Sequence, residues 1–335
     1  MFFRTAALFL LIYSTTAVPA SAQERVTVAT MRSVANGALF VAAARGYFKA
    51  EGIDLDMTAY ASDAEVAKAM TSGAAEIGFA AWSVETVKLA SQGAFKAVAG
   101  QIREKNGFEG NEIVISTAAY DRGIRKLEQV RNGVVFVDQV GTSLHYQFMQ
   151  AAKAKGGNDR DFAVRFAGSP AAAARAVAEG QADIAVLPMT QARNLLSVSQ
   201  ARLMAWCSQM AEPELGAVFA SAKMLGARRG FAEKFLRAYR RGVADFHDAF
   251  LRLDKYAKRV SNLQSRQAAK ILAHYIHPHA ALEEAAAVLE SEVYYMDRQA
   301  RLDTAELGQR IAWYQAQELI DRNVTAQGVV DLNFK

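Results

Sequence analysis

The feature of this sequence that most restricts its fold is an internal repeat at a fixed offset of 107 positions. In the first copy Ser62 opens an Ala-rich segment that ends at Gly73, and the short apolar segment 76–79 follows. The second copy keeps these spacings with Ser169, Gly180 and the segment 183–186. Chance similarity in an Ala-rich chain is the alternative, but it requires helix starts, helix ends and strands to coincide without a gap. We therefore interpret the two stretches as copies of one structural unit.

Each copy is predicted to alternate strands with helices. Segments 26–30 and 133–137 read as matching buried strands, and the helix after Ser62 begins with a capping box completed by Glu65. Its counterpart has Pro170 at the first helical position, where a missing amide costs little. Such alternation favours parallel sheets with helices on both faces. We expect an α/β chain with two similar lobes, each an open, mainly parallel sheet, and a ligand cleft between them.

The chain is expected to cross twice between the lobes. The β-rich segments 112–117 and 215–221 are interpreted as these crossings. The predicted first lobe is discontinuous, and the helical tail 230–328, which has no third copy of the repeat, is expected to pack back onto it. The predicted bounds are residues 23–108 with 216–335 for lobe 1 and residues 109–215 for lobe 2.

The N-terminal residues 1–22 have the pattern of an export signal: Arg4, then an apolar stretch, then a small-residue cleavage site before Gln23. The only Cys is Cys207, so neither a lipid anchor at this site nor an intrachain disulfide is expected. We expect a free periplasmic protein. A nucleic-acid partner is not expected, because the net charge of +5 is spread over separate basic clusters and the protein is exported.

Four segments resemble one family of proteins. LFVAAARGYFKAEGIDL (39–55), AKAMTSGAAEIGFA (67–80), GVVFVDQVGTSLHYQFMQAAKAKG (133–156) and AVAEGQADIAVLP (176–188) are similar to periplasmic solute-binding proteins of the nitrate, sulfonate, taurine and thiamine-precursor group. The resemblance implies a type II periplasmic-binding-protein fold that closes on a small solute. It also implies delivery of the solute to an ABC importer, whose permease and ATPase are in the inner membrane. A monomer without a cofactor is expected.

Ligands of open α/β sheets bind at the carboxyl ends of the strands. The corresponding loops are 31–36, 80–83, 138–145 and 188–190. Two hydroxyl residues follow Gly141 at a helix start, where free amides and the helix dipole favour an anionic or accepting group. A plain helix cap is the alternative. The candidate ligand-binding residues are Met31, Arg32, Ala81, Trp82, Gly141, Thr142, Ser143, His145, Pro188 and Met189.

The other candidates suggest the chemistry of the solute. Trp82 offers an indole for stacking, although it could equally fill the surface between the lobes. Met31 and Met189 suit an apolar solute, and Arg32 can pair with a carboxylate or sulfonate. Each of these also has an ordinary packing or surface interpretation. The mixture favours an organic solute, aromatic in part, with one polar or anionic end.

No catalytic residue, metal site or cofactor is predicted. His274, His277 and His279 have a metal-like spacing, but Pro278 breaks the helix and no other ligand is adjacent. Two alternatives to transport remain. One is an enzyme of the pyrimidine synthase or desulfinase type, which the resemblance places on the same fold. The other is a periplasmic sensor that closes on its ligand and docks to a receptor.

Overall fold

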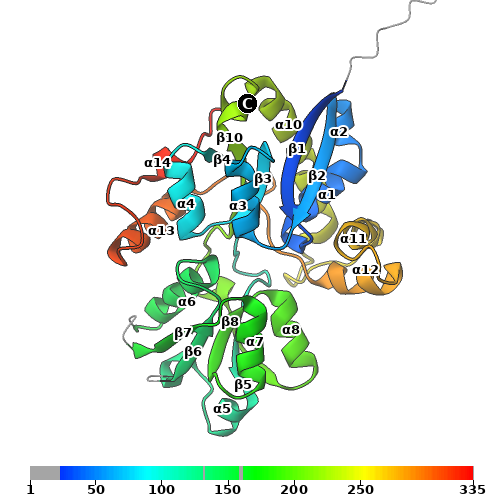
Figure 1. Cartoon of the computed structure of the whole chain (residues 1–335). Coiled ribbons are helices and arrows are strands. Elements are labelled where there is room, and N and C mark those ends of the chain that lie inside the picture. The colour runs from blue at the N-terminus through cyan, green and yellow to red at the C-terminus, as the bar shows by residue number, and fades with distance from the viewer. Residues whose placement is uncertain (1–22, 131–132, 158–160, 335) are drawn as a thin grey trace, which may run out of the picture.

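The computed structural model describes residues 23–130, 133–157 and 161–334, and the predicted signal peptide lies outside these residues. The described chain forms two five-stranded sheets, in the orders β2-β1-β3-β10-β4 and β7-β6-β8-β5-β9. Each sheet with its helices makes one lobe, and the two lobes lie one above the other in Figure 1. The predicted two-lobed α/β fold is therefore confirmed.

Lobe 1 contains the first four strands, a returning fifth strand and the C-terminal helices. Its strands are β1 (Glu24–Met31), β2 (Ile53–Tyr60), β3 (Ile77–Ala81), β4 (Phe95–Gly100) and β10 (Gly216–Ser221). Its helices are the 3-10 helix η1 (Val34–Asn36), α1 (Gly37–Ala44), α2 (Tyr47–Ala50), α3 (Asp63–Thr71), α4 (Val84–Ser91), α9 (Ala222–Leu225), α10 (Arg229–Phe250), α11 (Leu263–Ile276), α12 (Leu282–Ser291), α13 (Thr304–Ala316) and α14 (Ala326–Val329).

Lobe 2 is formed by the middle of the chain. Its strands are β5 (Glu112–Ser116), β6 (Val134–Val137), β7 (Ala163–Phe166), β8 (Ile184–Leu187) and β9 (Ala201–Trp206). Its helices are α5 (Thr117–Asp121), α6 (Ser143–Ala154), α7 (Pro170–Ala178), α8 (Met189–Ser197) and the 3-10 helices η2 (Leu127–Val130) and η4 (Cys207–Gln209). None of the helices in the described part of either lobe is long and apolar enough to cross a membrane.

The sequence repeat holds at the level of strand register. In lobe 1 Val28 pairs with Ile77, and in lobe 2 Val135 pairs with Ile184, both in parallel. Ser62 and Ser169, also 107 positions apart, each accept a hydrogen bond at the start of their helix. The two copies therefore share strand pairing and capping, as the sequence predicts.

The two segments interpreted as crossings are strands instead. β5 and β10 are each inserted antiparallel as the fourth strand of their sheet, between two strands that run the other way. The chain crosses just before each of them, in segments 101–111 and 207–215, which we call the crossing segments. β10 begins at Gly216 and β5 at Glu112. The domain bounds predicted from the sequence stay a prediction.

Each sheet is covered by helices on both faces. In lobe 1, Val26 and Val28 point into a core shared with α1, α10 and α11, whereas Ala29 points into a core shared with α3, α4 and α13. Alternate residues of a strand face opposite sides of the sheet, so a buried strand needs two cores. In lobe 2, Val135 and Phe136 divide in the same way between the α6 and α7 sides. The helical tail packs on lobe 1, as expected.

Candidate functional site

The strand ends of the two lobes meet along one junction. β1, β2 and β3 of lobe 1 end there, and so do β6 and β8 of lobe 2, because equivalent parallel strands end on equivalent sides of each sheet. Ten residues were predicted to bind a ligand in this region. The structure brings five of them together at one place and leaves the other five around it.

The loop Gly141–Ser143 contacts the end of β3 and the start of α4 directly. The amide of Val84 donates to the carbonyl oxygen of Gly141 over 3.0 Å. The hydroxyl of Ser143 lies 2.9 Å from the carbonyl oxygen of Trp82 and 3.0 Å from that of Leu215. Gly141 has φ +71°, and a Cβ atom there would lie 2.2 Å from Cγ2 of Val84. The predicted anion-binding loop is therefore bonded to lobe 1 of the same chain.

Helix α13 adds contacts to the same loop. The hydroxyl of Tyr314 donates to the carbonyl oxygen of Gly141 over 2.8 Å, and Nη1 of Arg310 lies 3.1 Å from the hydroxyl oxygen of Ser143. Nη2 of Arg310 donates to the carbonyl oxygen of Glu214. No sequence signal around Thr142 indicated that the C-terminal helix would reach this loop, because the contact spans about half of the chain.

Trp82 belongs to the core of lobe 1 in this arrangement. Its side chain is 0 % exposed, and its ring meets that of Phe219 edge to face with the centroids 5.2 Å apart. The indole Nε1 has no hydrogen-bond partner. A buried tryptophan usually finds a partner for this donor. Stacking of Trp82 on a solute stays a prediction, and it requires the indole to leave this core.

Thr142 and His145 are placed at the start of α6. Thr142 accepts a hydrogen bond from the amide of His145, and its own hydroxyl donates to Oδ1 of Asp138 over 2.6 Å. Nδ1 of His145 accepts from the amide of Gly141. The imidazole also meets the rings of Phe166 and Trp313 edge to face, with centroid distances of 5.1 Å to each. Both side chains stay partly accessible at the junction.

The remaining predicted residues are bonded to other elements. Met31 is half-buried against the α3 side of lobe 1, and Ala81 donates its amide to Asp63. Arg32 is exposed and donates to the carbonyl oxygen of Tyr275 in α11.

Pro188 is half-buried and caps α8, and the buried Met189 donates its amide to the hydroxyl of Tyr294. Arg32, through its bond to Tyr275, is thus directed toward helix α11 of the tail. Met189 belongs to the core on the α10 side of lobe 1.

Two carboxylates at the junction are absent from the predicted set. Oδ1 of Asp63 accepts a hydrogen bond from the amide of Ala81 over 2.7 Å, and Asp138 is held by Thr142. Burial raises the pKa of the Asp63 carboxyl, and the nearby charge of Asp138 raises it further, although backbone hydrogen bonds oppose the shift. Burial likewise raises the pKa of Asp138. Applying the strand-end rule to β2 as well would have identified Asp63 from the sequence.

A second polar group lies beside the crossing segments. Oε1 of the buried Glu104 accepts from the amide of Asn111 over 2.9 Å and from Nε2 of Gln147 over 2.6 Å. The hydroxyl of Tyr294 donates to Oδ1 of Asn111 over 2.7 Å. Burial raises the pKa of Glu104 to about 7, and these two hydrogen bonds oppose the shift. Neutral hydrogen-bond donors around the Glu104 carboxyl group thus connect three parts of the chain. Gln147 belongs to lobe 2, Asn111 to the first crossing segment and Tyr294 to the tail.

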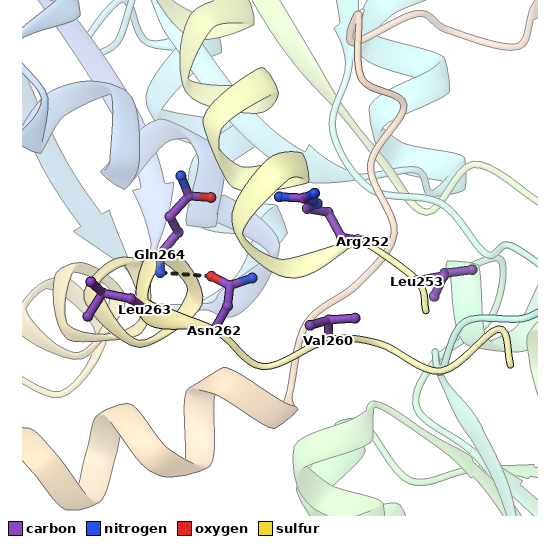
Figure 2. A pocket seen from close by; sticks show the side chains of 6 residues that line it. All are labelled: Arg252, Leu253, Val260, Asn262, Leu263 and Gln264. Carbon is purple, nitrogen blue, oxygen red and sulfur yellow. Dashed lines mark hydrogen bonds between the residues drawn. The ribbon is translucent and has the colours of Figure 1, made fainter. Parts of the chain in front are cut away.

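Two neighbouring cavities lie away from the strand ends. The first, of about 390 Å³, opens beside the connection between α10 and α11. Figure 2 shows its wall, in which Asn262 accepts a hydrogen bond from the amide of Gln264 at the start of α11. Arg252, Leu253, Val260 and Leu263 complete the lining. The second is lined by residues of the same connection and of α12. Neither includes a predicted ligand-binding residue.

The described residues offer little for covalent or metal chemistry. The thiol of Cys207 is buried, and this burial raises its pKa well above the ordinary value, so it is a poor nucleophile. Within residues 23–130, 133–157 and 161–334, no three His, Cys, Asp or Glu side chains are arranged to hold a metal ion. At the junction itself, the two lobes are held together by hydrogen bonds and packing within the chain.

Comparison with known families gives one match. The family described as NMT1/THI5 like matches residues 35–249, which is 215 of the 335 residues. No protein of curated function matches the sequence significantly.

Solved structures with the same fold include three solute-binding proteins. The aliphatic sulphonate binding protein SsuA of Escherichia coli has a TM-score of 0.70 at 12 % identity, over 92 % of this chain and 97 % of its own. The alkanesulfonate-binding protein SsuA of Xanthomonas axonopodis pv. citri, bound to MOPS, has a TM-score of 0.67 at 14 % identity, over 92 % of this chain and 98 % of its own. The nitrate-binding protein NrtA of Synechocystis PCC 6803 has a TM-score of 0.65 at 11 % identity, over 92 % of this chain and 85 % of its own. At these identities the likeness shows the fold, which is that of periplasmic binding proteins.

Proposed function

The chain belongs to the NMT1/THI5-like family, and from this premise we propose that it is an extracytoplasmic solute-binding protein that serves an ABC importer. It captures a small organic solute between its lobes and presents it to the permease and ATPase of the inner membrane. The observation that carries the proposal is the junction itself, where strand ends of two similar lobes meet. Ligands of open α/β sheets bind at such ends. The fold shared with the sulfonate-binding and nitrate-binding proteins supports this function.

The junction also bears on the chemistry of the solute. Asp63 and Asp138 lie at the junction, one from each lobe, and a small anion such as nitrate would be repelled by either carboxylate in its ionised form. We propose an organic solute that presents N–H groups or uncharged surface to this pair. An aromatic part or an anionic end, as the sequence suggests, then lies away from it, toward His145 and Thr142.

Export to the periplasm and a monomeric state are parts of the same proposal. The signal pattern of residues 1–22 supports export, and a solute receptor for an importer must reach the outer face of the inner membrane. A sensor on the same fold differs only in the partner that it docks to. Genes for a permease and an ATPase beside this gene would support transport.

A same-fold enzyme is a weaker alternative. An enzyme that uses cysteine needs an exposed thiol of lowered pKa, and Cys207 is buried with a raised pKa. We therefore propose binding without turnover.

The experiment is a thermal-shift screen of residues 23–335 against alkylsulfonates, nitrate, pyrimidines and aromatic carboxylates, with calorimetry on every hit. A solute that binds only the folded chain raises the melting temperature as its concentration exceeds the dissociation constant. One saturable organic hit is the expected result. If no compound of the four classes binds, or if a compound is consumed, the proposal is wrong.

A matched pair of cap variants locates the site of any hit. Thr142 at the junction and Ser116 at the start of α5 each accept one capping hydrogen bond, worth about 1 kcal/mol of stability. Thr142→Ala also removes the hydrogen bond to Asp138, so it should cost more stability than Ser116→Ala. Only Thr142→Ala is expected to weaken binding, because β5 is antiparallel and ends on the side of lobe 2 away from the junction. Equal affinities in both variants would remove Thr142 from the site.

A further inference from the structure

Helix α13 is a part of the C-terminal tail that packs on both lobes. Leu307 and Ile311 are buried in the core of lobe 1, together with Tyr314. Trp313 packs against this core and also against the α6 side of lobe 2. Its ring lies 5.3 Å from that of Tyr146 in α6, measured between centroids. The helix is therefore fixed to lobe 1 and extends aromatic and polar side chains to the first turn of α6.

Arg310 is the centre of these contacts. Its side chain is 0 % exposed, and the guanidinium carbon lies 4.4 Å from the centroid of the Tyr146 ring. One nitrogen lies 3.1 Å from the hydroxyl oxygen of Ser143 in lobe 2, and the other donates to Glu214 in the second crossing segment. Its ion-pair partner Glu306 is one helical turn earlier, with Nη2 and Oε1 3.7 Å apart. A planar guanidinium can hold two such acceptors in a fixed geometry.

Opening of the lobes would take partners away from Arg310. Its ion pair with Glu306 lies within α13 and would remain, but the guanidinium would lose the Ser143 hydroxyl and the Tyr146 ring. The network is already incompletely hydrogen-bonded, because Nε of Arg310 and Oε1 of Glu306 are buried and have no hydrogen-bond partner. If lobe 2 rotated away, the Ser143 contact would be lost, and Tyr314 would lose its bond to Gly141. The arrangement therefore favours one relative position of the lobes.

We propose that Arg310 is a positioning residue and that α13, with Tyr314, is a clasp that sets the angle between the two lobes. The clasp holds the start of α6 against the end of β3 and the start of β10, next to the proposed solute site. The effect on solute affinity rests on the proposed function. The effect on lobe geometry does not, and it can be measured without a solute.

The test is the distance between spin labels on the two lobes. Lys68 in α3 and Arg175 in α7 are exposed and occupy equivalent positions of the repeat, so Lys68→Cys with Arg175→Cys places one label on each lobe. α3 and α7 lie in the upper and lower lobes of Figure 1. Cys207 is buried and should remain unlabelled in the folded chain. Distances are measured by double electron–electron resonance without added solute.

Arg310→Met should shift the distance distribution to longer values and broaden it. The variant is expected to fold, because methionine fills a similar apolar volume and the pKa of Glu306 is already raised by burial, which lets that carboxyl become neutral. Arg310→Lys keeps the charge but not the forked geometry, so it should restore the distribution in part. Arg229→Met is the matched control, because Arg229 pairs with Asp331 inside lobe 1 over 3.0 Å. It should leave the distribution unchanged.

A folded Arg310→Met protein with the distribution of the parent would overturn the proposal. If Arg310→Met does not fold, Tyr314→Phe decides, since it removes one hydroxyl that binds Gly141 and keeps the ring. A smaller shift in the same direction supports the clasp, and an unchanged distribution overturns it. A negative result in the solute screen would leave this measurement unaffected.

Discussion

At the scale of single residues, burial decides which chemistry a side chain at a strand end can perform. Trp82 and Ser143 are next to each other across the junction, and both are engaged within the chain. Thr142 and His145, one helical turn apart at the start of α6, keep part of their surface accessible. Within one stretch of chain, Ser143 therefore takes part in packing between the lobes, whereas Thr142 and His145 remain accessible to a solute.

Replacement of Trp82 by Ala should destabilise the fold. Removing a fully buried indole from a packed core costs about 3–5 kcal/mol. Trp82→Phe should cost less, because it keeps an aromatic ring against Phe219 and gives up a donor that has no partner. Urea unfolding of both variants measures the free energies. A loss below about 1 kcal/mol in Trp82→Ala would mean that the indole is outside the core, available for stacking.

Gly141→Ala and Gly156→Ala separate backbone strain from lobe contact. Both glycines have φ +71°, so an alanine at either should cost about 1 kcal/mol. A Cβ at Gly156 meets open space, whereas one at Gly141 meets Val84 of lobe 1. Gly141→Ala should therefore lose more stability, and its lobes should move apart. The difference between the two unfolding free energies measures the contact, and equal losses would contradict it.

At the scale of elements, the first crossing segment carries an acid whose protonation is linked to folding. The pKa of Glu104 is raised from an ordinary 4.5 to about 7 in the folded chain. Between these values the unfolded chain releases a proton that the folded chain keeps. The contribution of Glu104 to stability therefore falls as pH rises from 4.5 to 7, by about 3 kcal/mol, and is constant above.

Glu104→Gln should remove this dependence, because a glutamine oxygen can still accept from Asn111 and Gln147. The free energies of unfolding of both proteins are measured at pH 5 and pH 7.5. The free energy of unfolding of Glu104→Gln, relative to that of the parent, should be higher at pH 7.5 than at pH 5. Glu76→Gln is the contrasting control. Burial raises the pKa of Glu76, but Arg228 and Lys223 outweigh it and the net shift is downward. The stabilising contribution of Glu76 is lost only as pH falls below the ordinary pKa of 4.5, so the difference between Glu76→Gln and the parent should stay nearly constant between pH 5 and pH 7.5.

Much of the fold could be predicted from local signals. Ser62 and Ser169 begin helices, Gly73 and Gly180 follow their ends with positive φ, and equivalent strands of the two copies pair in parallel. Caps and apolar periodicity are contained in short segments, so one sequence suffices to read them.

Other elements depend on the fold as a whole. The segments 112–117 and 215–221 are recognisable as β-rich from the sequence, but their insertion as antiparallel strands next to the sheet edge is decided by pairing with distant strands. Helices α1 and α2 are separated at Gly46, which adopts φ +72°. The contacts of Arg310 with Ser143 join residues far apart in the chain. Site residues could be placed on loops, but their partners could not.

At the scale of the whole molecule, two similar lobes are joined by two crossing segments and by a helical tail that contacts both. Such a molecule can enclose a solute by changing the angle between the lobes. Asp63 and Asp138, one from each lobe, are brought near each other only when the lobes meet. Binding and lobe geometry should therefore change together.

The most direct measurement is a calorimetric titration of residues 23–335 with a hit from the screen, combined with the Lys68–Arg175 label distance and recovery of the solute. One solute should bind per chain, the distance distribution should become narrower in its presence, and the solute should be chemically unchanged after release. Conversion of the solute, or saturable binding that leaves the distance distribution unchanged, would contradict capture between the lobes.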